Sequence, residues 1–323
     1  MVVNIILAYF IDLIIGDPRW LTHPVVLIGK LISFLEKILF KFLRKPLALR
    51  IGGVFLVIVV VVSSYFFTWA IIKTLTEING ILGRVAEIWL ISTTLATKSL
   101  AGAAREIYNL LQKGDIKEAR IKVGWIVGRD TENMESQQLT RATVETVAEN
   151  IVDGVLSPLF FAILGGAPLA MAYKAVNTLD SMVGYKNEKY KNLGWASARL
   201  DDLANFFPAR WAGLLLLCTA GLLGYRIKNV YQAVRRYAVK HPSPNSGIPE
   251  SAVAGALGVR LGGLNYYGGQ ASFRAYMGED NFPLEDVHII KTIRMMYISS
   301  ALGVISGLFF GGIALILLNK SLV

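Results

Sequence analysis

Residues 51–72 read IGGVFLVIVVVVSSYFFTWAII and contain no charged side chain. A membrane-crossing α-helix needs about 20 consecutive apolar residues, because the hydrocarbon core of a bilayer is about 30 Å thick. This stretch is long enough to cross it. The basic residues that precede it, Lys41, Arg44, Lys45 and Arg50, predict by the positive-inside bias that this end faces the cytoplasm.

The composition of the whole chain also indicates a membrane protein. Of its 323 residues, 54% are hydrophobic and 17% are charged, and the mean hydropathy is +0.50, whereas soluble domains carry about 25% charged residues. Because alternating β patterns are nearly absent, we predict an all-α, polytopic integral protein of the cell membrane with additional cytoplasmic helices and loops. Further candidate spans are residues 155–176, 206–224 and 300–318, with weaker ones at 2–15 and 85–103.

The chain shows no internal repeat and no linker rich in serine and glycine, so we predict one membrane-embedded domain over residues 1–323. Residues 100–123 are typical of two amphipathic soluble helices joined by a turn at Gly114 and Asp115. The net charge of +10 is dispersed over loops that flank the candidate spans and forms no recognisable nucleic-acid module. We therefore expect contact with membrane lipid and no nucleic-acid partner.

The candidate span 155–176 is interrupted by the sequence GGAP at residues 165–168. Glycine and proline disfavour a continuous helix, so we predict a discontinuous or bent helix here. A break would resolve a conflict, because a complete crossing would place the polar residues before and after the span on opposite membrane faces. We expect it to bring Asp153 and Asp180 into one polar cavity.

Three carboxylates share one face of a helix predicted over residues 131–152 and its continuation, since Glu145, Glu149 and Asp153 follow one another at intervals of four. A solvated acidic face would explain them. The face runs into an apolar segment, however, where uncompensated carboxylates are costly. Magnesium carrying phosphate oxygens would compensate them. Arg129, Arg141 or Lys174 would do so as structural counter-charges.

Similar polar groups lie at two further ends of apolar segments, one around Asn177 and Asp180 and the other from Arg199 to Arg210. Helix N-caps explain any one of these residues but not the recurrence. Carboxylates and amides for a metal, with arginines for phosphate, form a coherent combination. A last polar segment, HPSPNSGIPE at residues 241–250, predicts a loop, and no Walker A or GxGxxG pattern accompanies it.

Six blocks of this sequence together resemble the CobD/CbiB family of cobalamin biosynthesis, the adenosylcobinamide-phosphate synthases. They occur in order over almost the whole chain: AYFIDLIIGDPRWLTHPVVLIGKLI (8–32), VGRDT (127–131), ETVAENIVDGVLSPLFF (145–161), YKAVNTLDSMVGYKN (173–187), GWASARLDDLANFFPAR (194–210) and HPSPNSGIPESAVAGALGVRLGG (241–263). The resemblance implies a membrane ligase that uses ATP and magnesium. It would join adenosylcobyric acid to (R)-1-aminopropan-2-ol O-2-phosphate, giving adenosylcobinamide phosphate, and associate with other corrinoid-pathway enzymes.

An amide-forming site of this kind needs positioning and charge neutralisation more than a nucleophile, because ATP would activate the corrinoid carboxylate as an acyl phosphate. We predict that the catalytic residues are Glu145, Glu149, Asp153, Asp180, Asp201 and Asp202. The first five of these are the predicted magnesium ligands, and one carboxylate is an alternative base for the incoming ammonium. We predict that the substrates are bound by Arg129, Lys174, Asn177, Arg199, Asn205, Arg210, His241, Asn245 and Ser246.

Two alternatives stay open from the sequence. An intramembrane prenyltransferase-like enzyme would also use Asp-rich motifs, such as DDLAN at residues 201–205, to hold magnesium diphosphate. A non-catalytic membrane sensor or transporter is the other alternative. Fold class alone does not separate them, because function resides in the site.

Overall fold

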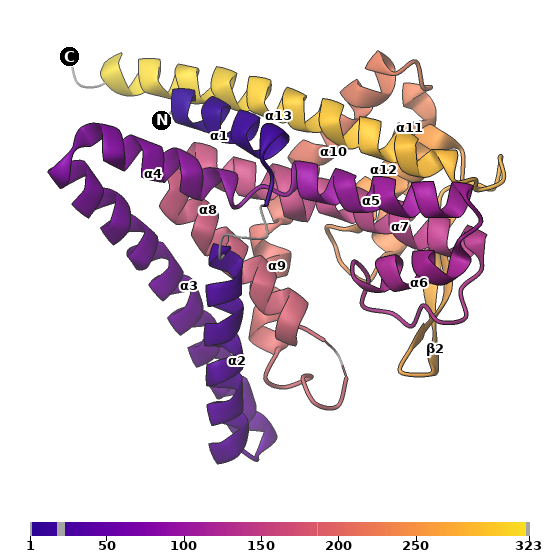
Figure 1. Cartoon of the computed structure of the whole chain (residues 1–323), viewed down its shortest axis with the longest axis horizontal. Helices are drawn as coiled ribbons and strands as arrows, with labels where there is room; N and C mark the ends of the chain where they lie inside the picture. The colour runs from indigo at the N-terminus through magenta and orange to yellow at the C-terminus, as the bar shows by residue number, and fades with distance from the viewer. Residues whose placement is uncertain (1, 18–22, 186, 321–323) are drawn as a thin grey trace. The chain divides into compact units, whose positions relative to one another are not determined.

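The computed structural model describes residues 2–17, 23–185 and 187–320 (Figure 1). Residues 18–22, within the first block quoted above, lie outside the described residues. The described chain consists mainly of α-helices, with a single two-stranded sheet among these residues, so the predicted all-α membrane fold is confirmed. By length and composition, the stretches Pro46–Ile78, Ser136–Val183 and Val287–Gly307 could each cross a membrane. The bent pair Trp195–Ala204 and Phe206–Leu222 would be a fourth span if it counts as one.

Two compact units make up the chain, and each is assembled from separate stretches of sequence. Unit 1 comprises residues 1–96, 157–205 and 304–323, and unit 2 comprises residues 97–156 and 206–303. The chain therefore passes repeatedly from one unit to the other without a linker. The single domain expected from the sequence stays a prediction, since each unit has its own internal packing.

Six helices lie in unit 1 of the described chain: α1 (Val2–Ile14), α2 (Pro24–Phe42), α3 (Pro46–Ile78), α4 (Gly80–Ser92), α8 (Ser157–Val183) and α9 (Trp195–Ala204). Helix α3 contains the uncharged residues 51–72, and it packs against α2, α4, α8 and α9. Buried Ile32, Leu56 and Leu179 lie in the shared core. Phe55 and Phe67 of α3 stay exposed, as expected for side chains that face lipid.

Helix α8 contains the predicted break. Its backbone leaves helical geometry at Gly165 (φ −153°, ψ 25°) and Gly166 (φ 64°, ψ −158°), just before Pro168. The positive φ of Gly166 is a conformation that favours glycine. The bent helix is thus confirmed. Because Asp153 and Asp180 belong to different units, their meeting in one cavity stays a prediction.

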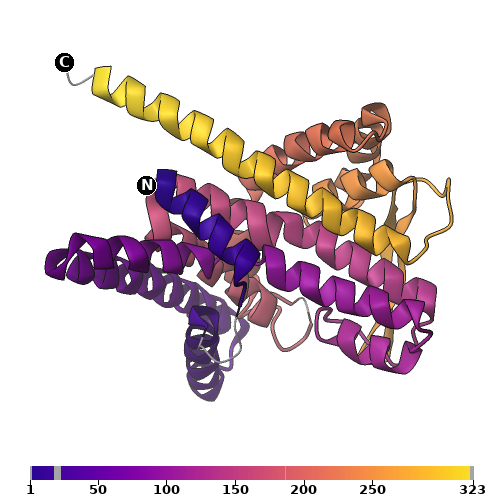
Figure 2. The same cartoon turned by 45° about the horizontal axis from the view of Figure 1, so that its top comes forward.

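Unit 2 combines shorter helices with one hairpin: α5 (Thr97–Gln112), α6 (Ile116–Gly124), α7 (Ser136–Asn150), the π-helical turn η1 (Ile151–Leu156), α10 (Phe206–Leu222), α11 (Ile227–Tyr237), the 3-10 turn η2 (Ala238–Lys240), α12 (Gly247–Leu257), β1 (Leu261–Tyr267) and β2 (Gln270–Met277). Helix α13 (Val287–Lys320) begins in unit 2 and ends in unit 1. Helices α5 and α6 confirm the predicted pair of helices joined by a turn, and α5 lies along α7 (Figure 2).

Several predicted helix limits were wrong. Helix α7 starts at Ser136 instead of residue 131, because Glu135 donates its backbone N–H to the side chain of Gln138 and so caps the helix there. The candidate span 85–103 is interrupted at residues 93–96, between α4 and α5. The last apolar helix begins at Val287, well before residue 300.

The β1–β2 hairpin was not expected from the sequence. Its strands are antiparallel, and Tyr267 pairs with Gln270 across a two-residue turn of Gly268 and Gly269, which both have positive φ. Asp130 holds this turn, since its carboxylate accepts the N–H groups of Gly268 at 2.9 Å and Gly269 at 2.7 Å. Gly262 forms a bulge in β1, where a Cβ atom would collide with the carbonyl of Ala275. The glycine-rich segment thus builds a rigid hairpin.

Candidate active site

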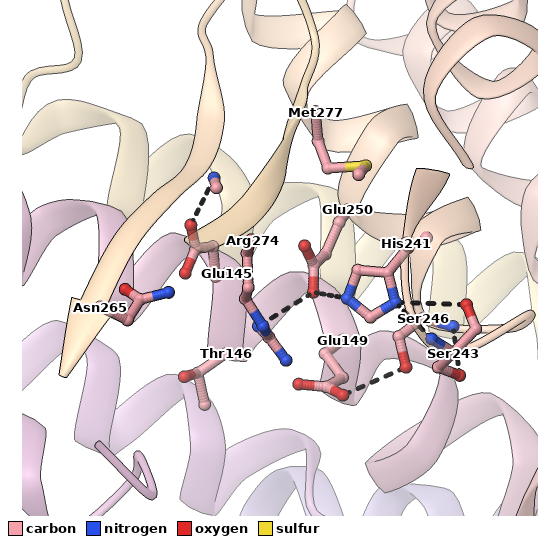
Figure 3. Close-up of polar contacts among 12 residues, drawn as sticks. Glu145, Thr146, Glu149, His241, Ser243, Ser246, Glu250, Asn265, Arg274 and Met277 are labelled. Carbon is pink, nitrogen blue, oxygen red and sulfur yellow. Dashed lines mark hydrogen bonds and ion pairs between the residues drawn. The ribbon is translucent and has the colours of Figure 1, made fainter. Parts of the chain in front are cut away.

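A cluster of charged side chains lies in the interior of unit 2, where α7, the loop before α12, α12 itself and the hairpin meet. We call it the polar core, and Figure 3 shows most of it. Its members are Arg129, Arg141, Glu145, Glu149, His241, Ser246, Glu250, Asn265 and Arg274. Burying this many charges is costly unless they are paired, so the pairing decides what each one can do.

Glu145 is the most completely neutralised carboxylate of the polar core. The Arg129 guanidinium lies 2.6 Å from Oε2, and the side chains of the two residues are only 5% and 3% exposed. Its other oxygen, Oε1, accepts the backbone N–H of Gly262 at 2.7 Å and lies 3.7 Å from Nε of Arg141. Glu145 therefore ties α7 to the hairpin bulge.

Two arginines of the polar core are engaged in holding the hairpin. Arg129 donates to the amide oxygen of Asn265 in addition to Glu145. Arg141 donates to the carbonyls of Gly262 and Leu264 and to the side chain of Asn265. Arg129 and Arg141 are two of the residues that the sequence offered as structural counter-charges to the acidic face of α7, in place of a metal.

The loop of residues 241–246 is fastened by two of its predicted site residues. Arg210 donates to Oδ1 of Asn245 at 2.6 Å and also to the carbonyl of Phe206. Ser246 donates its hydroxyl to Oε1 of Glu149 at 3.1 Å. Glu149 is half-buried, and this hydroxyl is the one hydrogen-bond partner that the described residues give its carboxylate. Glu149 thus keeps more capacity for a ligand than Glu145 does.

His241 and Glu250 form a buried ion pair, with Nε2 and Oε1 separated by 3.5 Å and the side chains 4% and 2% exposed. Nδ1 of His241 lies 3.0 Å from the backbone N and 3.2 Å from the carbonyl of Ser243, and Nε2 points toward Glu250. Burial alone would lower the pKa of His241, but the contact with Glu250 outweighs it and raises the pKa. Burial likewise raises the pKa of Glu250, more than His241 lowers it.

This pair predicts that the folded protein loses stability as the pH rises. A group whose pKa is higher in the folded protein than in the unfolded chain contributes most to stability at pH values below its unfolded pKa, which is about 6.5 for His and 4.3 for Glu. This contribution is lost as the pH rises through the pKa of the folded state. The unfolding temperature should therefore be lower at about pH 8 than at about pH 6. Glu250→Gln should reduce this difference. Asp280→Asn, at a carboxylate 56% exposed, is the control, and an equal slope in all three proteins would contradict the assignment.

Seven other predicted residues lie in unit 1, and two of them, Asp201 and Asn205, are in contact with each other. The side chain of Asn205, 1% exposed, accepts hydrogen bonds from Ser157 at 2.6 Å and Tyr173 at 2.8 Å and donates to Asp201 at 3.0 Å. This confirms that Asp201 and Asn205 share a face of α9. The remaining predicted residues of unit 1 are on α8, Lys174, Asn177 and Asp180, and on α9, Arg199 and Asp202.

The structure bears on the metal hypothesis in two ways. In the described part of the chain, no three His, Cys, Asp or Glu side chains converge to hold a metal ion. The π-helical turn at residues 151–156 also shifts Asp153 from the regular spacing that would stack it above Glu149. Magnesium commonly takes only one or two protein carboxylates and completes its shell with water and substrate phosphates. Glu149 and the Ser246 hydroxyl fit a metal that arrives with a nucleotide better than a cage made of protein side chains.

Sequence reasoning missed Glu250, Asn265 and Arg274 as members of the polar core. Glu250 stands at the end of the loop motif, beside residues that were chosen. Asn265 and Arg274 lie on the hairpin, whose Gly268-Gly269 pair after two tyrosines is a turn signal that could have been used. Without the hairpin, nothing places them beside α7.

Comparison with known proteins identifies the family of this chain. The model of the CobD/Cbib protein family matches residues 5–296. The cobalamin biosynthesis protein CbiB of Salmonella typhimurium is 48% identical over 296 residues, which cover 92% of this chain and 93% of that protein. Cobalamin biosynthesis protein CobD of Geobacter metallireducens is 47% identical over 293 residues, 91% of each chain. No solved structure matches this chain. The chain therefore belongs to the CobD/CbiB family of cobalamin biosynthesis proteins.

Proposed function

We propose that this protein is an ATP-dependent ligase of the cell membrane, crossing it several times. It joins the activated carboxylate of adenosylcobyric acid to the amine of (R)-1-aminopropan-2-ol O-2-phosphate, giving adenosylcobinamide phosphate. The observation that carries the proposal is the match to cobalamin biosynthesis proteins over more than nine-tenths of both chains. The polar core of unit 2 supports it, because three of the six blocks of the resemblance contribute residues to its contacts.

Amide formation would proceed by transfer of a phosphoryl group from ATP to the corrinoid carboxylate. Attack by the amine then forms the C–N bond, expels phosphate and leaves a proton to be removed from nitrogen. Glu149 is suited to accept that proton or to assist phosphate neutralisation, since its carboxylate is the least compensated of the three on the polar core. Magnesium bound with ATP would neutralise phosphate charge.

The phosphate of the amine should contribute strongly to its use. We expect the purified protein to use aminopropanol phosphate with a kcat/KM roughly 10- to 150-fold higher than aminopropanol, because a hydrogen bond to a charged group is worth about 1.5–3 kcal/mol. Mass spectrometry of the corrinoid product at varied amine concentration measures both values. Equal catalytic efficiency with the two amines would contradict the prediction.

The same preparation tests the function itself. Adenosylcobyric acid, aminopropanol phosphate and ATP should together yield the amide with stoichiometric nucleotide cleavage, and omission of any one should abolish it. Turnover of an isoprenyl diphosphate in place of the corrinoid would favour the prenyltransferase alternative. No ATP turnover with all substrates present would favour a sensor or transporter. Binding to other corrinoid-pathway enzymes can be tested by co-purification.

A further inference from the structure

Arg274 differs from the other arginines of the polar core because its donors are unused. Among the described residues its guanidinium makes one contact, an ion pair of 4.0 Å with Oε1 of Glu250. That distance is beyond hydrogen-bond range, and a guanidinium carries five N–H donors. The side chain is 29% exposed, so a ligand can reach it.

Two of the three arginines predicted from the sequence to bind phosphate, Arg129 and Arg210, have few donors left for a ligand. Arg129 is 5% exposed and bonds Glu145 and Asn265. Arg210 donates to three acceptors of its own unit and stacks on the ring of Phe206 at 3.8 Å. Both hold the fold in place. Arg274 instead presents a planar guanidinium whose paired N–H donors match two oxygens of a phosphoryl group.

The hairpin fixes the position of the Arg274 guanidinium. Asp130 holds its turn and Glu145 holds its bulge, so β2 carries Arg274 into the polar core as part of a rigid element. Figure 3 shows the guanidinium between Glu250 and Glu149, and the charges of both carboxylates act on it.

The charge balance of the polar core leaves room for an anion. Three carboxylates face three guanidinium groups and one imidazole. Glu145 is neutralised by Arg129 and Arg141, and Glu250 is paired with His241. Arg274 is therefore the cation of the polar core left for a phosphoryl group, and Glu149 is the one carboxylate near it that no other cation of the polar core neutralises.

We propose that Arg274 is the phosphoryl-binding residue of this site and that its guanidinium grips two oxygens of a substrate phosphate. The identity of that substrate rests on the proposed function. Two substrates of the proposed reaction carry such a phosphoryl group, the aminopropanol phosphate and ATP. Arg274 is thus a specificity-determining residue delivered by the hairpin.

Binding measurements on the full chain in lipid nanodiscs test this without requiring turnover. Calorimetry would compare wild type, Arg274→Gln and Arg274→Lys with aminopropanol phosphate, aminopropanol and ATP as separate probes. We expect Arg274→Gln to weaken one phosphate-bearing probe roughly 10- to 150-fold and to leave aminopropanol unchanged. The probe that weakens identifies the source. Arg274→Lys should lie between, because it keeps the charge but loses the paired N–H donors.

Arg260→Gln is the matched control, since Arg260 is 43% exposed and pairs with Asp280 at 2.9 Å just before the hairpin. Unchanged affinity of Arg274→Gln for both phosphate probes, or an equal loss in Arg260→Gln, would overturn the proposal. If Arg274→Gln does not fold, the affinity of Arg274→Lys for the two phosphate probes decides instead, and an affinity equal to that of wild type would overturn the proposal. Phosphate binding without amide synthesis would contradict only the proposed function, whereas amide synthesis with unaltered binding by Arg274→Gln would contradict only this inference.

Discussion

Replacing Glu149 with glutamine is expected to reduce corrinoid amide formation by roughly 100-fold or more, the loss seen when one preorganised electrostatic group is removed from an active site. Glutamine keeps the shape and can still accept from Ser246 but removes the least compensated negative charge of the polar core. The rate of amide formation at saturating substrates, measured over a range of magnesium concentrations, gives the result. Expression and unfolding temperature without ligand should stay near those of wild type.

The alternative is that the acidic face of α7, which carries Glu149, is only solvated and takes no part in the reaction. In that case Glu149→Gln would relieve repulsion between neighbouring carboxylates, leave amidation intact and add a few tenths of a kcal/mol of stability at most. Near-normal amidation with unchanged magnesium dependence would remove Glu149 from the proposed machinery. Glu279→Gln is the comparison variant, since Glu279 is a carboxylate of unit 2 that is 53% exposed and lies apart from the polar core.

Replacing Arg129 with methionine should cause the largest loss of stability. It would leave the Glu145 carboxylate, 3% exposed, without the guanidinium at 2.6 Å. Removing one partner of a buried ion pair costs about 3–5 kcal/mol. The remaining contact of Glu145 with Arg141 at 3.7 Å puts the expected value at the lower end. The free energy of unfolding in detergent measures it.

A second substitution tests the cause. Glu145→Gln in the Arg129→Met background removes the unpaired charge, so stability should partly return. Arg260→Met breaks an exposed pair with Asp280 and should cost about 0–1 kcal/mol. If Arg129→Met were as mild as Arg260→Met, or if the double variant were no more stable than Arg129→Met, the ion pair would not be the reason for the effect.

Much of the fold could be predicted because it follows from local chemistry. Uncharged length predicts the span in α3, and the GGAP sequence breaks α8, since glycine loses much backbone freedom in a helix and proline lacks the N–H that a helix needs. The hairpin could not be derived as easily, because its register depends on Asp130 and on the bulge at Gly262. Those contacts join residues far apart in the sequence.

The candidate site likewise has residues that the sequence could predict and residues that only long-range contacts reveal. Glu145, Glu149 and Ser246 were predicted from the sequence, and the structure brings them together with His241 in the polar core of unit 2. Arg274 was missed because a lone arginine in a short polar segment carries no signal until the hairpin turns it toward α7. Sequence could suggest that α7 needs positive partners, but not which arginine would be engaged and which would keep its donors.

The contact between Glu145 and Gly262 spans 117 residues, which has a consequence for the order of synthesis. Arg129 and Glu145 leave the ribosome close together and can pair early. The hairpin follows roughly 6 to 23 s later at about 5–20 residues per second. During that interval the acidic face of α7 has no bulge to cover it and must remain in water, because lipid would leave its carboxylates unsolvated. The polar core is therefore complete only after the hairpin has been synthesised, and until then the newly made chain lacks the contact between Glu145 and Gly262.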